Sequence, residues 1–376
     1  MILPTVSFLV SVVFTSIALH HTHRLWCLPF IILPSYVSLT TAHQLGDIDE
    51  LWAIGLAIYF VHVTSVLFFE KWVLPRPQRK KYDFAAAYKI WSNPQMLNTS
   101  RQAPGAHQVE YPPSVVRFIV VRVIRIALHV LLTQLSALYI FPGPFLPLPA
   151  DDFSPSKQVY FRRLLGLYNG PPVTPRETAI RTLSATHWIW TSYLTLTAAH
   201  DALALFFTLI LRLDTPADWP HLFGSPREAY TLRGFWGRFW HRLIYRPYTN
   251  YARWVAQCVL RLRPGSAVEE RCVVLGVFLL SGGLHAVVNW AVGMEIGGEG
   301  EGGMRDVWWY GINFVAGLVE RMAIMGLKRW RKDYFYFWGG RGLERTGRVV
   351  GFVWVFGFFF WSIPKREYPV MYAILS

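Results

Sequence analysis

The sequence predicts an all-α, polytopic membrane protein, a bundle of about eight helices (seven to nine) that cross a bilayer. Two observations lead to this fold class. Of the 376 residues, 53% are hydrophobic and only 16% are charged, whereas soluble domains carry about 25% charged residues. Long apolar runs also alternate with basic segments. We therefore expect a single integral-membrane domain over residues 1–376. The composition excludes a disordered chain, a collagen-like fibre and a disulfide-rich mini-domain, and it argues against a pair of soluble domains.

Eight segments are candidates for membrane-spanning helices, because a helix needs about 20 apolar residues to cross the ~30 Å hydrocarbon core. In chain order they are Thr5–Leu19, Trp26–Ala42, Leu51–Phe69, Phe118–Phe141, Leu183–Leu211, Cys272–Val292, Val307–Leu327 and Val349–Ile363. The third, sixth and seventh are the clearest of these. The first and last are short.

Three of the segments depart from a simple apolar run. The second is interrupted by Pro29 and Pro34, and proline disturbs a helix interior. The fourth carries Arg122 and Arg125 near its start, so we expect its helix to begin one turn later than its apolar character suggests. The fifth is long enough to be tilted or broken.

The basic residues orient these helices. Of the 37 Lys and Arg residues, 26 fall in segments that follow the odd-numbered helices and eight in segments on the other side; the remaining three lie inside helices. Cytoplasmic loops are enriched in Lys and Arg. We therefore expect the basic segments to face the cytosol and the N-terminus to be lumenal.

Those basic segments have two interpretations. In the first interpretation, the runs from Lys71 to Lys81 and from Lys328 to Lys332 determine the topology and bind anionic lipid, with a binding free energy of about 1 kcal/mol per residue. Alternatively, they capture an anionic co-substrate that arrives from the cytosol. Nucleic acid is not an expected partner, because the basic residues are distributed by membrane side and do not form one groove. The acidic, glycine-rich run over 297–303 indicates an exposed connector and lacks the Lys of a phosphate-binding loop.

The cysteines and the N-terminal segment carry little functional signal. The sequence contains three cysteines, Cys27, Cys258 and Cys272. Their number is odd and their spacing does not match that of metal ligands, so we expect no disulfide and no metal site. A cleavable signal peptide is not expected, because no basic residue precedes the first apolar segment and no small-residue cleavage site follows it.

Ionisable residues inside the predicted helices are candidates for function, because a central charge costs roughly 2.5–3.5 kcal/mol on insertion scales. They are His62, His129, His187, His200, Asp201, His285, Glu320 and Arg321. We expect Glu320 and Arg321 each to pair with another helix, and His200 and Asp201 to form interhelical hydrogen bonds. A lone histidine such as His62 or His129 is expected to be a satisfied packing residue.

His285 differs from these in its surroundings. Ser281, His285 and Asn289 recur every fourth residue and form one polar stripe on an otherwise apolar helix. Gly282 and Gly283 lie beside the stripe, where small residues allow close approach by another backbone or by a ligand. The stripe is therefore either a helix-packing surface or a neutral imidazole in a dry pocket open to a substrate.

A second group of residues occupies a predicted cytosolic segment, Leu232–Pro247. It is amphipathic, cationic and rich in aromatic residues, among them Trp236, Arg238, Trp240 and His241. One interpretation is an interfacial helix anchored by Trp and Arg. The other is a binding surface in which Arg contacts phosphates and aromatic rings flank an organic ligand. Together with the His285 helix, this segment forms a motif-bearing core over 232–292.

The order of these two motifs is similar to that in a known family. Arg-Gly-Phe-Trp-Gly-Arg-Phe-Trp-His (233–241) followed by Phe-x-x-Ser-Gly-x-x-His (278–285) resembles the wax-synthase-like branch of the membrane-bound O-acyltransferase (MBOAT) superfamily. More narrowly, the chain resembles the fungal members that acetylate terpenoid and meroterpenoid alcohols. A segment with Asn93-Pro94 and Thr99 resembles a further family stretch, although Gln95 stands where Arg is expected.

The resemblance implies a helical bundle around a buried reaction chamber in the endoplasmic reticulum membrane. It implies that His285 is catalytic, that Trp236, Arg238, Trp240 and His241 lie near the acyl-CoA site, and that acetyl-CoA is a co-substrate with no permanently bound cofactor. The residues fit this chemistry, because the pKa of ~6.5 of an unperturbed histidine suits a general base. Asn289 is expected to orient the His285 ring or to donate to the acceptor alcohol.

Two competing functions remain open at this stage. The first is an enzyme of the same class that makes long-chain esters such as waxes or sterol esters. The second is a transporter in which His285 and Asn289 line a substrate path, although the halves of the chain show no convincing internal repeat.

Overall fold

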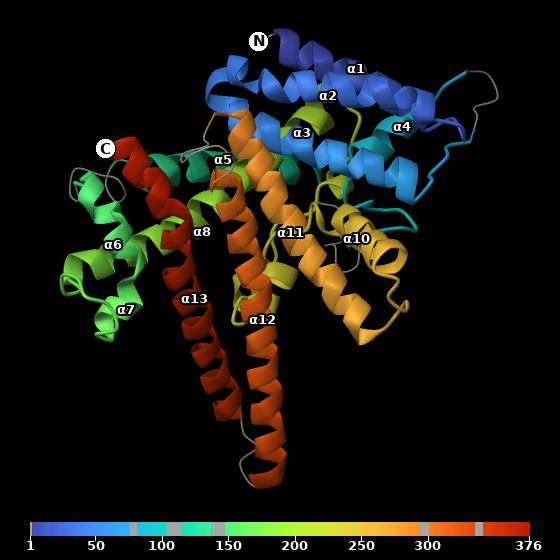
Figure 1. Ribbon diagram of the computed structural model, residues 1–376. Coiled ribbons are helices and arrows are strands. Elements are labelled where there is room, and N and C mark those ends of the chain that lie inside the picture. The colour runs from blue at the N-terminus through green and yellow to red at the C-terminus, as the bar shows by residue number, and fades with distance from the viewer. Residues whose placement is uncertain are drawn as a thin grey trace. The chain divides into compact units, whose positions relative to one another are not determined.

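A computed structural model describes residues 2–75, 81–103, 114–136, 138, 147–293, 301–334 and 341–376 (Figure 1). These residues form helices joined by turns and loops, and no strand occurs among them. The chain divides into two compact units. Unit 1 comprises Met1–Ala106 and Arg242–Val315, and unit 2 comprises His107–His241 and Ala316–Ser376. The all-helical prediction is therefore confirmed for the described residues.

Unit 1 contains the N-terminal helices and the helix that carries His285. Its α-helices are α1 (Ile2–Ala18), α2 (Leu28–Thr40), α3 (Asp49–Thr64), α4 (Phe84–Trp91), α10 (Tyr245–Trp254), α11 (Ala267–Ala291) and the first part of α12 (Glu301–Tyr334). Helices α1 and α2 run side by side (Figure 1). Polar side chains between apolar helices are satisfied there, because the Ser11 hydroxyl lies 2.9 Å from that of Ser35 and the Tyr59 hydroxyl lies 2.7 Å from that of Thr15.

Unit 2 contains the second group of helices. They are α5 (Val115–Leu135), α6 (Pro155–Gln158), α7 (Tyr160–Leu164), α8 (Pro175–Leu205), α9 (Leu232–Gly234), the remainder of α12 and α13 (Arg341–Leu375). Thr174 caps the N-terminus of helix α8, because its hydroxyl accepts a hydrogen bond from the Glu177 N–H. Pro175 is the first residue of the helix.

Charged residues inside unit 2 pair between helices. Asp201 on α8 lies fully buried between Arg122 and Arg125 of α5, and the Arg125 Nη2 to Asp201 Oδ1 distance is 2.8 Å. This confirms the expected interhelical bonding of Asp201. The prediction that the arginines delay the start of this helix is wrong, because α5 begins at Val115. Its arginines lie inside the helix, where Asp201 compensates their charge.

Glu320 on α12 is also buried and paired. Its carboxylate accepts hydrogen bonds from the Leu232 N–H (2.7 Å) and from the indole N–H of Trp354 on α13 (2.8 Å). The expected pairing of Glu320 with other helices is confirmed.

Three helices end in the same way. The five-residue π-turns Ser65–Phe69, Phe206–Ile210 and Val255–Val259 are each followed, two residues on, by a basic residue at positive φ: Lys71, Arg212 and Arg261. Cations at a helix C-terminus interact favourably with its dipole. All three lie in the segments predicted to face the cytosol.

Among the residues that the structure describes, four helices are long and apolar enough to cross a membrane: Ala42–Phe69, Pro175–Ile210, Ala267–Ala291 and Arg345–Leu375. They cover the third, fifth, sixth and eighth predicted segments. The first two predicted segments coincide with the shorter apolar helices Ile2–Ala18 and Leu25–Thr40. Phe118–Phe141 coincides with α5 as far as Leu135, and its end lies outside the described residues. Val307–Leu327 lies within α12 but is not among the four. The count of eight therefore stays a prediction.

The predicted connector over 297–303 lies partly outside the described residues, which omit 297–300. Glu301, Gly302 and Gly303 belong to α12, so the prediction of a connector is wrong for these three residues.

Candidate active site

Helix α11 carries His285 and is well defined at its start. The Ser266 hydroxyl accepts a hydrogen bond from the Glu269 N–H at 3.2 Å, and Glu269 and Glu270 place two acidic residues in the first turn. The helix then runs without interruption to Ala291, so Ser281, His285 and Asn289 lie on one face as their spacing predicts.

The two glycines beside this stripe are in different surroundings. A Cβ on Gly282 would lie 2.6 Å from the Cα of Val307 and 3.0 Å from the carbonyl oxygen of Asp306, both on α12. A Cβ on Gly283 would meet no atom within 4 Å. Gly282 is therefore the residue that lets the α11 and α12 backbones approach each other, as small residues do in membrane helices.

The polar stripe contacts the same part of α12. The His285 ring stacks on that of Tyr310, with centroids 5.2 Å apart and an interplanar angle of 13°. The Asn289 amide donates to the Asp306 carboxylate at 2.7 Å, and Asp306 and Tyr310 are both buried. His285 itself is half-buried. Its ring is thus held in one plane while part of it remains accessible.

The aromatic segment in unit 2 has its own local structure. Thr231 caps α9, and the segment continues as a π-turn over Phe235–Phe239, closed by a hydrogen bond from the Trp240 N–H to the Phe235 carbonyl (2.7 Å). Gly234 is required here, because a Cβ would lie 2.0 Å from the Glu228 carbonyl oxygen, whereas Gly237 has open space. The first glycine of the motif therefore shapes the turn.

The four predicted binding residues of this segment divide into two kinds. Trp240 is 7% exposed and stacks on Trp188, with ring centroids 5.5 Å apart, so it packs inside unit 2 and stabilises the segment. Trp236 is half-buried, and Arg238 is exposed and pairs with Glu228 at 2.8 Å. That carboxylate raises the pKa of Arg238.

His241 follows directly and is half-buried. Its ring packs against Phe223 and Trp240, and its Nδ1 is buried without a hydrogen-bond partner in the described parts of the chain. Burial lowers the pKa of His241 to about 4, because the interior disfavours the charged form. The ring is therefore neutral at physiological pH.

The predicted site residues fall in different units. His285 and Asn289 belong to unit 1, and Trp236, Arg238, Trp240 and His241 belong to unit 2, so the predicted motif-bearing core over 232–292 is divided after His241. Within unit 1 the structure brings His285 and Asn289 onto one face against α12. Within unit 2 it brings Trp240 and His241 together.

Sequence reasoning missed Tyr310 and Asp306. Asp306 immediately precedes the predicted segment Val307–Leu327, and Tyr310 lies one turn into it, so hydropathy gave no reason to single out either residue. In the described residues, no group of three or more His, Cys, Asp or Glu side chains is arranged to hold a metal ion.

Comparison with known proteins supports the family expectation. Residues 219–309 match the membrane-bound O-acyl transferase family. The chain is 33% identical to acetyltransferase nanB of Aspergillus nanangensis, over 50% of this chain and 43% of the relative. It is 29% identical to acetyltransferase aurG of Calcarisporium arbuscula and 28% identical to acetyltransferase TRI7 of Fusarium sporotrichioides, in each case over 48% of this chain and 40% of the relative.

The chain thus covers less than half the length of these curated relatives. The family match includes both motifs, Arg233–His241 and Phe278–His285. The predicted resemblance to membrane-bound O-acyltransferases, and to fungal acetyltransferases in particular, is thereby confirmed.

Proposed function

We propose that this protein is a membrane-bound O-acyltransferase that moves an acetyl group from acetyl-CoA to a hydroxyl of a hydrophobic terpenoid or meroterpenoid. The observation that carries the proposal is the similarity of half the chain to a fungal acetyltransferase, together with the family match over 219–309, which contains His285. The apolar helices support a substrate that partitions into the bilayer.

His285 acts as the general base in this proposal. Its imidazole takes the proton of the acceptor hydroxyl while the hydroxyl oxygen attacks the thioester carbonyl. The carbonyl–sulfur bond then breaks, CoA leaves as the thiolate, and the imidazolium returns the proton to the sulfur. The stack on Tyr310 supports this role, because it holds the ring plane while leaving the side chain half-buried. General-base action of this kind contributes about 10²–10⁴-fold.

Trp236 and Arg238 are the residues of the aromatic segment that we assign to direct contact with CoA. Arg238 is exposed and Trp236 is half-buried, and a guanidinium suits the CoA phosphates. Trp240 and His241 have supporting roles, because Trp240 is buried and stacks on Trp188, and the neutral His241 ring packs against Phe223 and Trp240.

The decisive experiment measures acetyl transfer by membranes that contain the protein. Radiolabelled acetyl-CoA is supplied with a panel of terpenoid alcohols, and mass spectrometry identifies a product with one added acetyl group. His285→Ala should abolish transfer, whereas Gly283→Ala, on the same helix but in open space, should retain it. Retained activity in inserted His285→Ala protein would refute the base assignment.

The same assay separates the competing functions. An enzyme for long-chain esters would use palmitoyl-CoA in preference to acetyl-CoA. A transporter would consume neither donor. Preference for acetyl-CoA is the result expected here.

We further propose that the protein lies in the endoplasmic reticulum membrane with a lumenal N-terminus. The charge distribution supports this topology. Single exposed cysteines test it: in a Cys258→Ser background, Arg263→Cys should react with a membrane-impermeant maleimide in sealed microsomes, and Arg162→Cys only after permeabilisation. The reverse pattern would invert the topology.

A further inference from the structure

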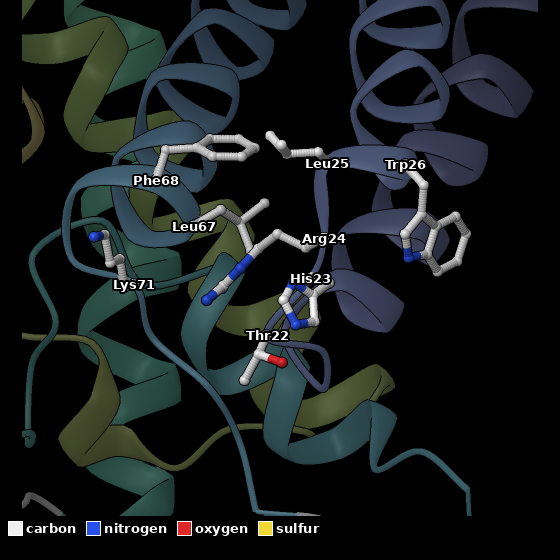
Figure 2. A pocket seen from close by; sticks show the side chains of 8 residues that line it. All are labelled: Thr22, His23, Arg24, Leu25, Trp26, Leu67, Phe68 and Lys71. Atoms are coloured by element: carbon white, nitrogen blue, oxygen red, sulfur yellow. The ribbon is translucent and has the colours of Figure 1, made fainter.

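A cavity in unit 1 lies away from His285, at the ends of α1 and α3. Its volume is about 420 Å³, within the ~300–1,000 Å³ range of small-molecule sites. The lining residues are Thr22, His23, Arg24, Leu25, Trp26, Leu67, Phe68 and Lys71 (Figure 2). Figure 2 shows the Arg24 guanidinium extending past Leu67 towards the side on which Lys71 lies, with Thr22 and His23 below it and Leu25 and Phe68 above.

Arg24 is the unusual residue of this cavity. It is only 6% exposed, and one of its nitrogens, Nη1, donates to the Trp72 carbonyl at 2.6 Å. Within the described parts of the chain it forms no ion pair with a carboxylate. Burial lowers its pKa, which reflects the cost of holding a guanidinium out of water without an anion. A bound anion would offset that cost.

The rest of the lining has the composition expected around a charged headgroup with acyl chains. Among the described residues that line the cavity none is acidic, and Lys71, His23 and Thr22 add a second cation and further hydrogen-bonding groups. Leu25 and Trp26 beside them are 71% and 50% exposed. A water-soluble phosphate ester would leave these apolar side chains in water, whereas a lipid would cover them.

The position in the chain agrees with this composition. Arg24 and Lys71 follow the first and third apolar segments and lie on the predicted cytosolic side. Anionic lipids are concentrated in the cytoplasmic leaflet, and basic groups beside helix ends recognise their headgroups.

We propose that this cavity is a binding site for the phosphate headgroup of an anionic phospholipid, separate from the acyl-transfer chemistry. The Arg24 guanidinium binds the phosphate oxygens, Lys71 adds a second positive charge at the rim, and Leu25 and Phe68 contact the start of the acyl chains.

The test titrates the full-length protein in neutral detergent with fluorescent phosphatidylserine and fluorescent phosphatidylcholine, and follows anisotropy. Phosphatidylserine should bind about tenfold more tightly, because its headgroup carries a net charge of −1 (phosphate, ammonium and carboxylate), whereas the phosphate and the quaternary ammonium of phosphatidylcholine sum to zero. Lys71→Gln should weaken phosphatidylserine binding about fivefold, the effect of one basic residue at an anionic surface. Arg24→Gln should weaken it at least about tenfold, since it removes a charge-assisted contact.

Arg261→Gln is the matched control. Arg261 is exposed, belongs to unit 1 and follows a π-turn at positive φ as Lys71 does, but it does not line the cavity. It should leave the affinity unchanged. An equal loss in Arg261→Gln and Lys71→Gln would mean that overall charge alone attracts the lipid, and would overturn the proposal. Equal affinity for the two lipids would overturn it as well.

A competition measurement separates the possible sources of the phosphate group. Unlabelled phosphatidylserine should displace the probe, whereas inorganic phosphate and CoA at millimolar concentration should not, because they lack acyl chains. Displacement by CoA would identify the cavity as a site for a soluble phosphate ester and would overturn the assignment to lipid. None of these binding results depends on whether the protein transfers acetyl groups.

Discussion

The contact between α11 and α12 at Gly282 gives the sharpest test of how the candidate site is held. In a Gly282→Ala variant the new Cβ would lie 2.6 Å from the Cα of Val307 and 3.0 Å from the Asp306 carbonyl oxygen. Ordinary contacts begin at 3.4 Å, so the two helices must separate locally by about 0.8 Å. Both clashing atoms belong to backbone, which cannot rotate away as a flexible side chain does.

The expected magnitude follows from two opposing effects. Overpacking costs about 1–3 kcal/mol, while replacing glycine by alanine inside a helix gains about 1 kcal/mol. Gly282→Ala should therefore be destabilised by up to about 2 kcal/mol. A displacement near 1 Å close to reacting groups costs on the order of 10²-fold in rate, so we expect acetyl transfer to fall by about that factor.

Gly283→Ala is the matched control, because it makes the same chemical change at the adjacent position, where no atom lies within 4 Å. It should retain activity and be as stable as the parent or more so. Thermal unfolding in detergent and acetyl transfer in membranes measure the two quantities. If both variants lose activity equally, the close approach at Gly282 does not position His285, and the reasoning fails.

Three further predictions concern unit 2. Asp201→Asn leaves the guanidinium groups of Arg122 and Arg125 without their buried anion. Such a loss costs about 3–5 kcal/mol, so the thermal unfolding temperature should fall markedly. Arg238→Ala removes only an exposed pair with Glu228, so unfolding should be unchanged while the KM for acetyl-CoA rises; a change confined to the acceptor alcohol would contradict its role. The lowered pKa of His241, about 4, means that the unfolded chain binds the extra proton first as pH falls below about 6.5. The free energy of unfolding therefore has its full value above pH 6.5 and decreases as the pH falls towards 4. At pH 5 the titration of His241 lowers it by up to about 2 kcal/mol. His241→Phe should reduce the difference in unfolding temperature between pH 7 and pH 5. An unaltered difference would refute the lowered pKa of His241.

The sequence was sufficient to predict helices but not their ends or pairings. The sixth apolar segment, Cys272–Val292, corresponds closely to α11, because its hydropathy and length are unambiguous. The seventh, Val307–Leu327, identifies only the middle of α12, since hydropathy marks the apolar part of a helix and not its polar ends. Ser266 followed by Glu269 is a capping signal that was visible in the sequence.

The partners of the candidate residues required coordinates. Two adjacent glycines are equivalent in sequence, yet only Gly282 touches α12, because the difference depends on the rotation of α11 about its axis. The stack of His285 on Tyr310 likewise depends on how two helices cross. Arg122 and Arg125 are spaced three residues apart, which places them on one helix face, and this spacing was an unused signal that they share the partner Asp201.

The bond from Asn289 to Asp306 fixes the orientation of the Asn289 side chain. Its NH₂ group, which carries two N–H donors, donates to the Asp306 carboxylate at 2.7 Å. The amide oxygen then points away from Asp306 and is an acceptor. An acceptor one helical turn from His285 could take a hydrogen bond from the imidazole N–H, and the second N–H of the amide could donate to the acceptor alcohol. The bond to Asp306 therefore accommodates both roles predicted for Asn289, and both stay predictions.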